Sequence, residues 1–102
     1  MRKKALKCEV NIAVSIFKEG ASFVAYSPVL DLSTSAGSLK KVKERFSEAV
    51  SLFFEELMEK GILEEALKDL GWKKVKSEMV PPKMISQGLE KINLPVCSSQ
   101  YA

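Results

Sequence analysis

The sequence predicts an α+β domain in which an antiparallel sheet of three or four strands is covered on one face by a long helix. Residues 5–17 alternate between apolar and polar side chains, as a half-buried strand does. Turn-forming residues then interrupt the chain at Gly20, Pro28 and Gly37. From Leu39 onward, apolar residues recur at helical spacing. Strands followed by helices are typical of this fold class.

Three strands are expected in the first third of the chain. In residues 5–17, one parity is apolar: Leu6, Cys8, Val10, Ile12, Val14 and Ile16. Gly20 can adopt a positive φ, so a tight turn there leads to a second strand over residues 21–26. Because Pro28 cannot donate to a strand ladder, the second strand must end there or lie at an edge. A short third strand is expected over residues 30–34.

A long helix is expected after the third strand, with Ser38 as its N-cap. Its apolar residues cover an arc of roughly 140°, which is wide enough to lie on a sheet. These residues are Leu39, Val42, Phe46, Ala49, Val50, Phe53, Phe54 and Leu57. Gly61 is expected to end this helix, and a shorter helix is expected over residues 62–70. Residues 72–76 are expected to form either a last strand, which would be the fourth in the sheet, or an extended segment.

A chain of 102 residues is expected to form one domain. We assign residues 1–77 to the α+β domain and residues 78–102 to a C-terminal extension or arm, because prolines at 81, 82 and 95 interrupt regular structure. One sheet with one helical layer leaves a sheet face or edge uncovered. A homodimer or higher homo-oligomer is therefore expected, and the extension is a candidate for an exchanged arm.

Composition and charge point to a cytoplasmic protein. No apolar run approaches the roughly 18 residues needed to span a bilayer, so no membrane association is expected. The basic start at Met1 is not followed by an uninterrupted apolar segment, which argues against a secretory signal. Lys and Glu are abundant, whereas Asn and Gln occur only twice each, a balance found in thermophile proteins.

Catalysis, metals and cofactors are not expected. The chain has no histidine, which removes the commonest general base and metal ligand. Its two cysteines, Cys8 and Cys97, lie at opposite ends, and Cys8 is expected to be a small buried hydrophobe. The strand carboxylates Glu9 and Asp31 lack a third acid at a spacing that would suit a two-metal nuclease.

Two charged segments are candidate binding surfaces. The first is acidic and would attract a basic protein: Glu55, Glu56, Glu59, Glu64 and Glu65. The second combines charge with an aromatic ring, as single-strand nucleic-acid binders do: Trp72, Lys73, Lys74 and Lys76. Each has a simpler explanation. The acids would be a solvated helix face, and Trp72 would complete the core while the lysines point into solvent.

An ordered set of residues over positions 8–60 adds a family resemblance. A strand ends before a proline, an apolar turn and a glycine follow, and a helix with an apolar face begins: Phe23, Tyr26, Pro28, Leu30, Gly37 and Ala49. This order resembles the HicB-like antitoxin domain. The chain departs from that family in having Leu32 and Ser33 where a Gly-Cys pair is usual, and lysines where the first helical turn is usually acidic.

The resemblance implies a partial ribonuclease-H-like fold without catalytic acids. It also implies a protein that neutralises a small, basic, RNA-cleaving toxin by direct binding. Many relatives carry a C-terminal domain that binds operator DNA. Operator binding is not expected here, because the residues after Ser77 are too few and too broken by proline for a helix-turn-helix. The alternative function is a small nucleic-acid-binding protein that uses residues 72–76.

Overall fold

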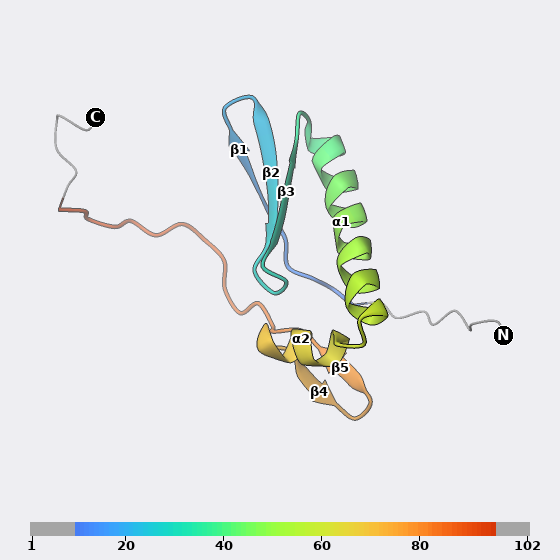
Figure 1. Cartoon of the computed structure of the whole chain (residues 1–102). Helices are drawn as coiled ribbons and strands as arrows, with labels where there is room; N and C mark the ends of the chain where they lie inside the picture. The colour runs from blue at the N-terminus through green and yellow to red at the C-terminus, as the bar shows by residue number, and fades with distance from the viewer. Residues whose placement is uncertain (1–9, 96–102) are drawn as a thin grey trace.

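The computed structural model describes residues 10–95 and confirms the predicted α+β class (Figure 1). A three-stranded sheet is followed by a long helix that packs on it, then by a short helix and a two-stranded sheet. The elements are β1 (Ser15–Glu19), β2 (Ser22–Ser27), β3 (Leu32–Ala36), α1 (Leu39–Glu59), α2 (Leu63–Asp69), β4 (Lys73–Val75) and β5 (Glu78–Val80). The predicted burial of Cys8 lies outside the described residues.

The main sheet is antiparallel in the order β1-β2-β3. Gly20 closes the β1–β2 hairpin at φ +60°. The prediction of a first strand over residues 5–17 was wrong within the described part, because residues 10–14 form no strand and β1 begins at Ser15. The length of its partner strand, β2, limits β1. β2 ends at Ser27, just before Pro28, so the ladder has its last pair at Ser15 and Tyr26.

The turn between β2 and β3 is part of the core. Its residues Val29 and Leu30 are 6% and 2% exposed, and Asp31 adopts a positive φ of 51°. β3 therefore starts at Leu32, two residues later than predicted, because the turn uses Leu30 and Asp31. The Ser27 side chain beside the turn is fully buried, and its hydroxyl has no hydrogen-bond partner among the described residues.

Both ends of α1 follow the capping chemistry that the sequence predicts. The Ser38 hydroxyl accepts a hydrogen bond of 3.1 Å from the backbone N–H of Lys41. At the other end, Gly61 adopts φ +71°, and the N–H groups of Gly61 and Ile62 donate to carbonyls in the last turn of α1. These two bonds form a Schellman motif. The motif ends the helix at a left-handed backbone conformation, which glycine adopts readily.

Replacing Ser38 by Ala should lower the free energy of unfolding by about 1 kcal/mol, because the Lys41 N–H loses its acceptor. Replacing Ser38 by Asp should retain most of the stability, since aspartate caps helices equally well. Urea unfolding followed by circular dichroism measures both changes. Equal losses in the two variants would contradict the capping role.

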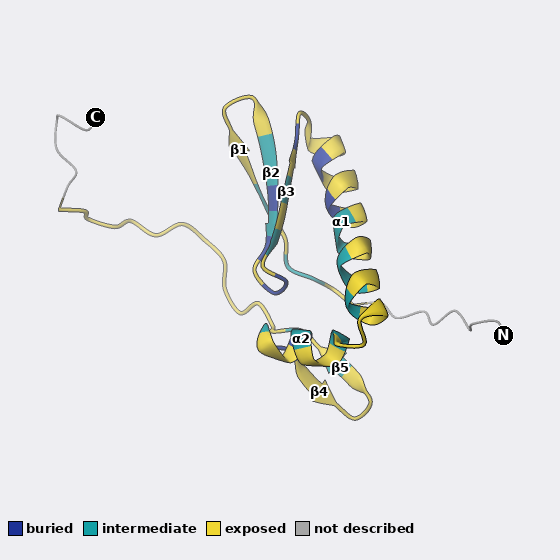
Figure 2. Ribbon diagram, in the orientation of Figure 1, coloured by how far each residue is buried: buried dark blue, intermediate teal, exposed yellow. Residues whose placement is uncertain are grey.

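The core consists of two clusters that meet at Leu32 and Val50 (Figure 2). The first lies between the sheet and α1 and contains Ala25, Ala36, Val42 and Phe46. The second lies between the β2–β3 turn, the second half of α1 and α2, and contains Val29, Leu30, Leu67 and Trp72. Because Leu32 and Val50 pack against both clusters, the domain has one continuous apolar interior.

Of the two predicted alternatives, three or four strands, the main sheet has three. Residues 73–75 form β4, which pairs with β5 in a separate two-stranded sheet (Figure 1). The chain turns away because Gly71 adopts φ +98° after α2 and Trp72 is buried in the second cluster. The turn of this hairpin includes residue 77, and residue 78, the predicted first residue of the C-terminal extension, belongs to β5. Met79 of β5 packs against the second cluster.

Beyond Val80 the chain runs without helix or strand to Leu94 and extends away from the body (Figure 1). We call residues 81–95 the C-terminal arm. The radius of gyration is 17.7 Å and the molecule measures 66 × 30 × 22 Å. A compact chain of about 100 residues has a radius of gyration near 13 Å, so the arm is not folded onto its own domain.

Candidate functional site

The charges of α1 are divided along its length. Its first half carries the basic residues Lys40, Lys41, Lys43 and Arg45 together with the acids Glu44 and Glu48, whereas the charged residues of its second half are all acidic: Glu55, Glu56 and Glu59. This order opposes the helix dipole, which favours acids at the start and bases at the end by about 0.3–1 kcal/mol each. The acids of the second half therefore gain no stabilisation from the helix dipole.

One of the basic residues has a structural role. The guanidinium of Arg45 donates a hydrogen bond of 3.0 Å to the carbonyl oxygen of Ser35. Ser35 belongs to β3, which is an edge strand of the main sheet. Arg45 therefore ties the first half of α1 to the edge of the sheet.

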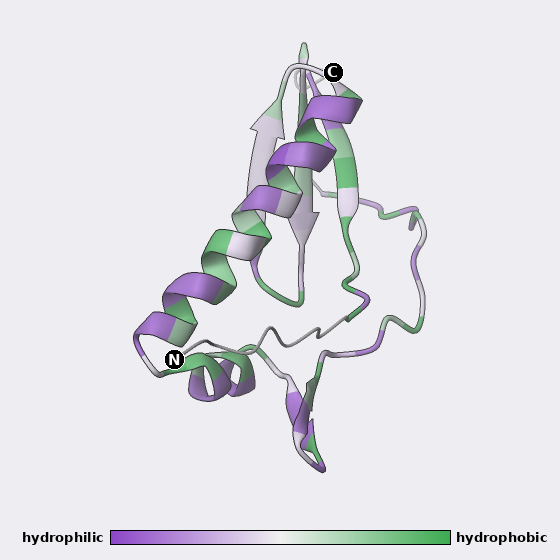
Figure 3. Ribbon diagram, turned by 90° about the vertical axis from the view of Figure 1, so that its right-hand side faces the viewer, coloured by the Kyte–Doolittle hydropathy of each residue, from purple (hydrophilic) through white to green (hydrophobic). Residues whose placement is uncertain are grey.

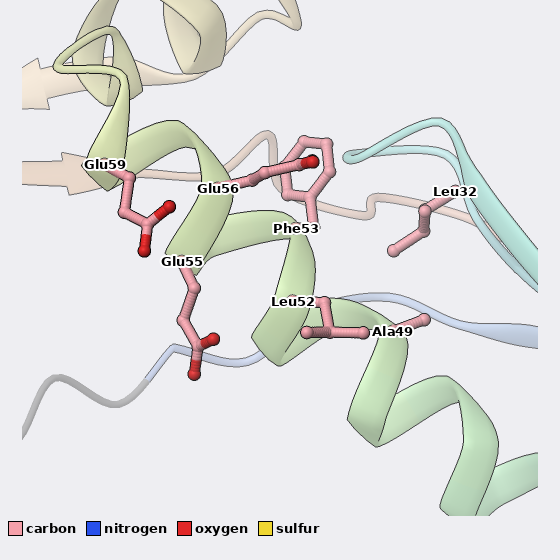
Figure 4. A pocket seen from close by; sticks show the side chains of 7 residues that line it. All are labelled: Leu32, Ala49, Leu52, Phe53, Glu55, Glu56 and Glu59. Atoms are coloured by element: carbon pink, nitrogen blue, oxygen red, sulfur yellow. The ribbon is translucent and has the colours of Figure 1, made fainter.

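An open depression of about 570 Å³ lies between the second half of α1 and β3 (Figure 4). We call it the acidic groove. It is lined by Leu32, Ala49, Leu52, Phe53, Glu55, Glu56 and Glu59. Figure 4 shows the Leu32 side chain reaching from the sheet toward the helix, while the three carboxylates follow the last turns of α1.

The groove combines exposed apolar surface with carboxylates that have no ionic partner within residues 10–95. Leu52 is 65% exposed, and Phe53 is half-buried. None of Glu55, Glu56 and Glu59 forms an ion pair with any residue in the described part of the chain. An occupant of this groove would therefore meet both an apolar floor and a free negative charge.

The other two predicted acids are not part of this groove. Glu64 lies on α2 and forms ion pairs with Lys74 at 3.2 Å and Lys68 at 3.3 Å. The hydrogen bond from Lys74, followed by that from Lys68, lowers the pKa of Glu64. Glu65 is exposed on the same helix. The structure therefore brings together three of the five predicted acids and neutralises a fourth.

Trp72 is a core residue. Its ring is 4% exposed and lies edge-on to Phe54, with 6.3 Å between the ring centroids. Its indole N–H donates a hydrogen bond of 2.8 Å to the carbonyl oxygen of Val29. This confirms the interpretation that Trp72 completes the core. The ring is not available to stack on a nucleic-acid base.

The three lysines of the predicted nucleic-acid set are exposed on and after β4. Lys73 and Lys74 belong to the strand, and Lys76 adopts a positive φ of 60° in the turn to β5. Lys74 is paired with Glu64, whereas Lys73 and Lys76 form no ion pair with the residues that the structure describes.

The residues that carry the family resemblance are spread over the fold. Leu30 is buried, and Phe23 packs against the first core cluster. The Tyr26 hydroxyl donates to the Asp31 carboxylate at 3.1 Å, and this hydrogen bond raises the pKa of Tyr26. Pro28 follows β2, and Gly37 precedes α1. Ala49 alone among these residues lines the acidic groove.

Three groove residues were not among the predicted site residues: Leu32, Leu52 and Phe53. Leu52 gave a signal in the sequence, because it lies outside the apolar arc of its helix. Phe53 did not, since its position in the arc predicts a core residue. Leu32 joins the groove only because β3 packs beside α1.

Within residues 10–95, no three side chains of His, Cys, Asp or Glu gather in a way that could hold a metal ion. The helices in this part of the chain are too short or too polar to cross a membrane. Comparisons of the chain with family models, curated proteins and solved structures found no match.

Proposed function

We propose that this chain is a non-catalytic protein-binding module of the cytoplasm, a HicB-like antitoxin that neutralises a small RNA-cleaving toxin by direct binding. The observation that carries the proposal is the acidic groove. There, three carboxylates that form no ion pair in the described part of the chain lie beside the exposed side chain of Leu52. The resemblance of residues 8–60 to the HicB-like domain supplies the class of partner.

The chemistry of such a partner fits the groove. A toxin that grips RNA needs lysines and arginines that contact phosphates. The carboxylates of Glu55, Glu56 and Glu59 would attract this basic surface, speed the encounter and compete with RNA for it. An apolar side chain of the toxin, placed between its basic residues, would contact Leu52 and Phe53 and add affinity that salt does not screen.

The alternative is a small nucleic-acid-binding protein that uses residues 72–76. It is less well supported, because the ring that would stack on a base is buried and one of the lysines is paired with an acid. The acidic groove would also repel phosphate. This alternative predicts that single-stranded RNA binds the purified chain and that Lys73 and Lys76 produce the salt dependence.

The test co-expresses this chain with the product of the neighbouring reading frame, which the proposal predicts to be a small basic protein, and purifies the complex. The double substitution Glu55→Lys and Glu56→Lys should weaken the complex by tenfold or more, mainly through a slower association rate. The difference should shrink in high salt, because the Debye length falls from about 10 Å at 0.1 M to about 3 Å at 1 M. Surface plasmon resonance measures both effects.

A matched control separates the groove from total charge. Glu44→Lys with Glu78→Lys changes the net charge equally, but both residues are exposed outside the groove. This control should retain most of the association rate. If both double variants slow association equally, or if the wild-type chain binds single-stranded RNA rather than the basic protein, the proposed function is wrong.

A further inference from the structure

The C-terminal arm carries a series of apolar side chains that its own domain leaves exposed. Ile85 is 85% exposed, Leu89 is fully exposed at 102%, and Ile92 is 66% exposed. Met84 and Leu94 are also exposed, and Figure 3 shows hydrophobic residues recurring along the arm. Single exposed apolar residues need no explanation, but a series of this kind marks an interaction surface.

The arm is suited to binding in an extended form. Pro81, Pro82 and Pro95 disfavour a helix at its two ends, and Gly88 lies near its middle. A segment of this length would also be marginal as an isolated helix. Fully extended, it spans up to about 45–50 Å, which is enough to reach across a neighbouring molecule of this size.

We propose that the arm of one copy docks in the acidic groove of a second copy, and that reciprocal exchange of arms forms a homodimer. The arm carries Lys83 and Lys91 against a single acid, Glu90, whereas the groove is lined by three carboxylates that are not ion-paired with any of the described residues. Ile85 and Leu89 would cover the apolar floor at Leu52 and Phe53. In this contact, the apolar side chains of the arm would therefore meet the apolar residues of the groove, and the lysines of the arm would face the carboxylates of the groove.

Docking occurs between copies because of where the arm leaves the domain. It starts after β5, and both Figure 1 and Figure 3 show it on the side of the body away from α1. To reach its own groove, the arm would have to reverse around α2 and the β4–β5 hairpin. Exchange between two copies avoids that path and forms two equal contacts per dimer, as two-fold symmetry requires.

This inference goes beyond the proposed function. The docked arm would cover Glu55 and Glu56, so a basic partner would have to displace it before binding the same groove. The docking itself requires no partner. It can therefore be tested on the purified chain alone, and its failure would leave the proposed function standing.

The first experiment is sedimentation velocity of the full chain over about 1–100 µM, where oligomerisation depends on concentration. The wild type should form dimers. Ile85→Ser with Leu89→Ser should raise the dimer dissociation constant by tenfold or more. The control, Met58→Ser with Val75→Ser, removes two exposed apolar residues outside the arm and the groove and should leave the dimer intact. Circular dichroism checks that each variant is folded.

The second experiment exchanges charges. A groove variant, Glu55→Lys with Glu56→Lys, should dimerise poorly, as should an arm variant, Lys83→Glu with Lys91→Glu. A mixture of the two should form heterodimers, because both contacts in the mixed dimer then pair opposite charges. A wild-type chain that stays monomeric, a dimer indifferent to Ile85 and Leu89, or a mixture that associates no better than its components would overturn the proposal.

Discussion

Replacing Phe46 by Ala is expected to lower the free energy of unfolding by about 3–5 kcal/mol, a large share of the stability of a small domain. The ring is 7% exposed and belongs to the cluster of Ala25, Ala36 and Val42 between the sheet and α1. Two of its neighbours are alanines, whose small side chains do not refill the space. A large cavity should therefore remain, and urea unfolding measures the resulting loss of stability.

Phe53→Ala provides the comparison for this prediction. Phe53 lies two turns further along the same face of α1, but its ring is half-buried and lines the acidic groove. Less apolar area returns to water when it is truncated, so its loss of stability should be clearly smaller. Equal losses of stability for the two variants would contradict the difference in burial between the two rings.

The second large effect is expected at Trp72. Truncation to Ala should cost about 3–5 kcal/mol, because the ring is buried between Phe54 and the β2–β3 turn. Trp72→Phe keeps a ring but removes the indole N–H, leaving the Val29 carbonyl without its donor. That variant should lower the free energy of unfolding by about 1–3 kcal/mol. Urea unfolding followed by circular dichroism measures both.

Because Trp72 is the one tryptophan of the chain, its fluorescence also distinguishes the two functions. A buried indole should emit at short wavelength and resist quenching by acrylamide. Single-stranded RNA should leave the emission unchanged, since no base can reach the ring. Quenching by acrylamide in the folded chain, or a spectral change on adding RNA, would contradict the core role and favour the nucleic-acid alternative.

The groove and the arm together give the proposed antitoxin a specific resting state. The charges of Glu55 and Glu56 serve a basic partner in the proposed function and the lysines of a second copy in the proposed dimer. A different assay tests each of the two proposals. Sedimentation of the purified chain tests the arm, whereas co-expression with a basic protein tests the partner.

Several features of this protein were determined by local sequence alone. The apolar spacing after residue 38 placed α1, and the hydroxyl of Ser38 and the positive φ of Gly61 set its two ends. β2 ends before Pro28 because proline has no N–H group, and the positive φ of Gly20 forms the turn of the first hairpin. Each is decided by one residue or by a repeating pattern, so each can be read without the rest of the fold.

Tertiary structure decided what the candidate site contains. Glu64 resembles Glu56 in the sequence, but its carboxylate is neutralised by Lys74, ten residues further along the chain. Trp72 resembles a stacking residue among lysines, but the carbonyl of Val29, 43 residues away, binds its N–H in the core. These outcomes depend on which distant segments meet when the sheet and the two helices pack. Side-chain type and spacing do not specify those distances, and only the folded chain sets them.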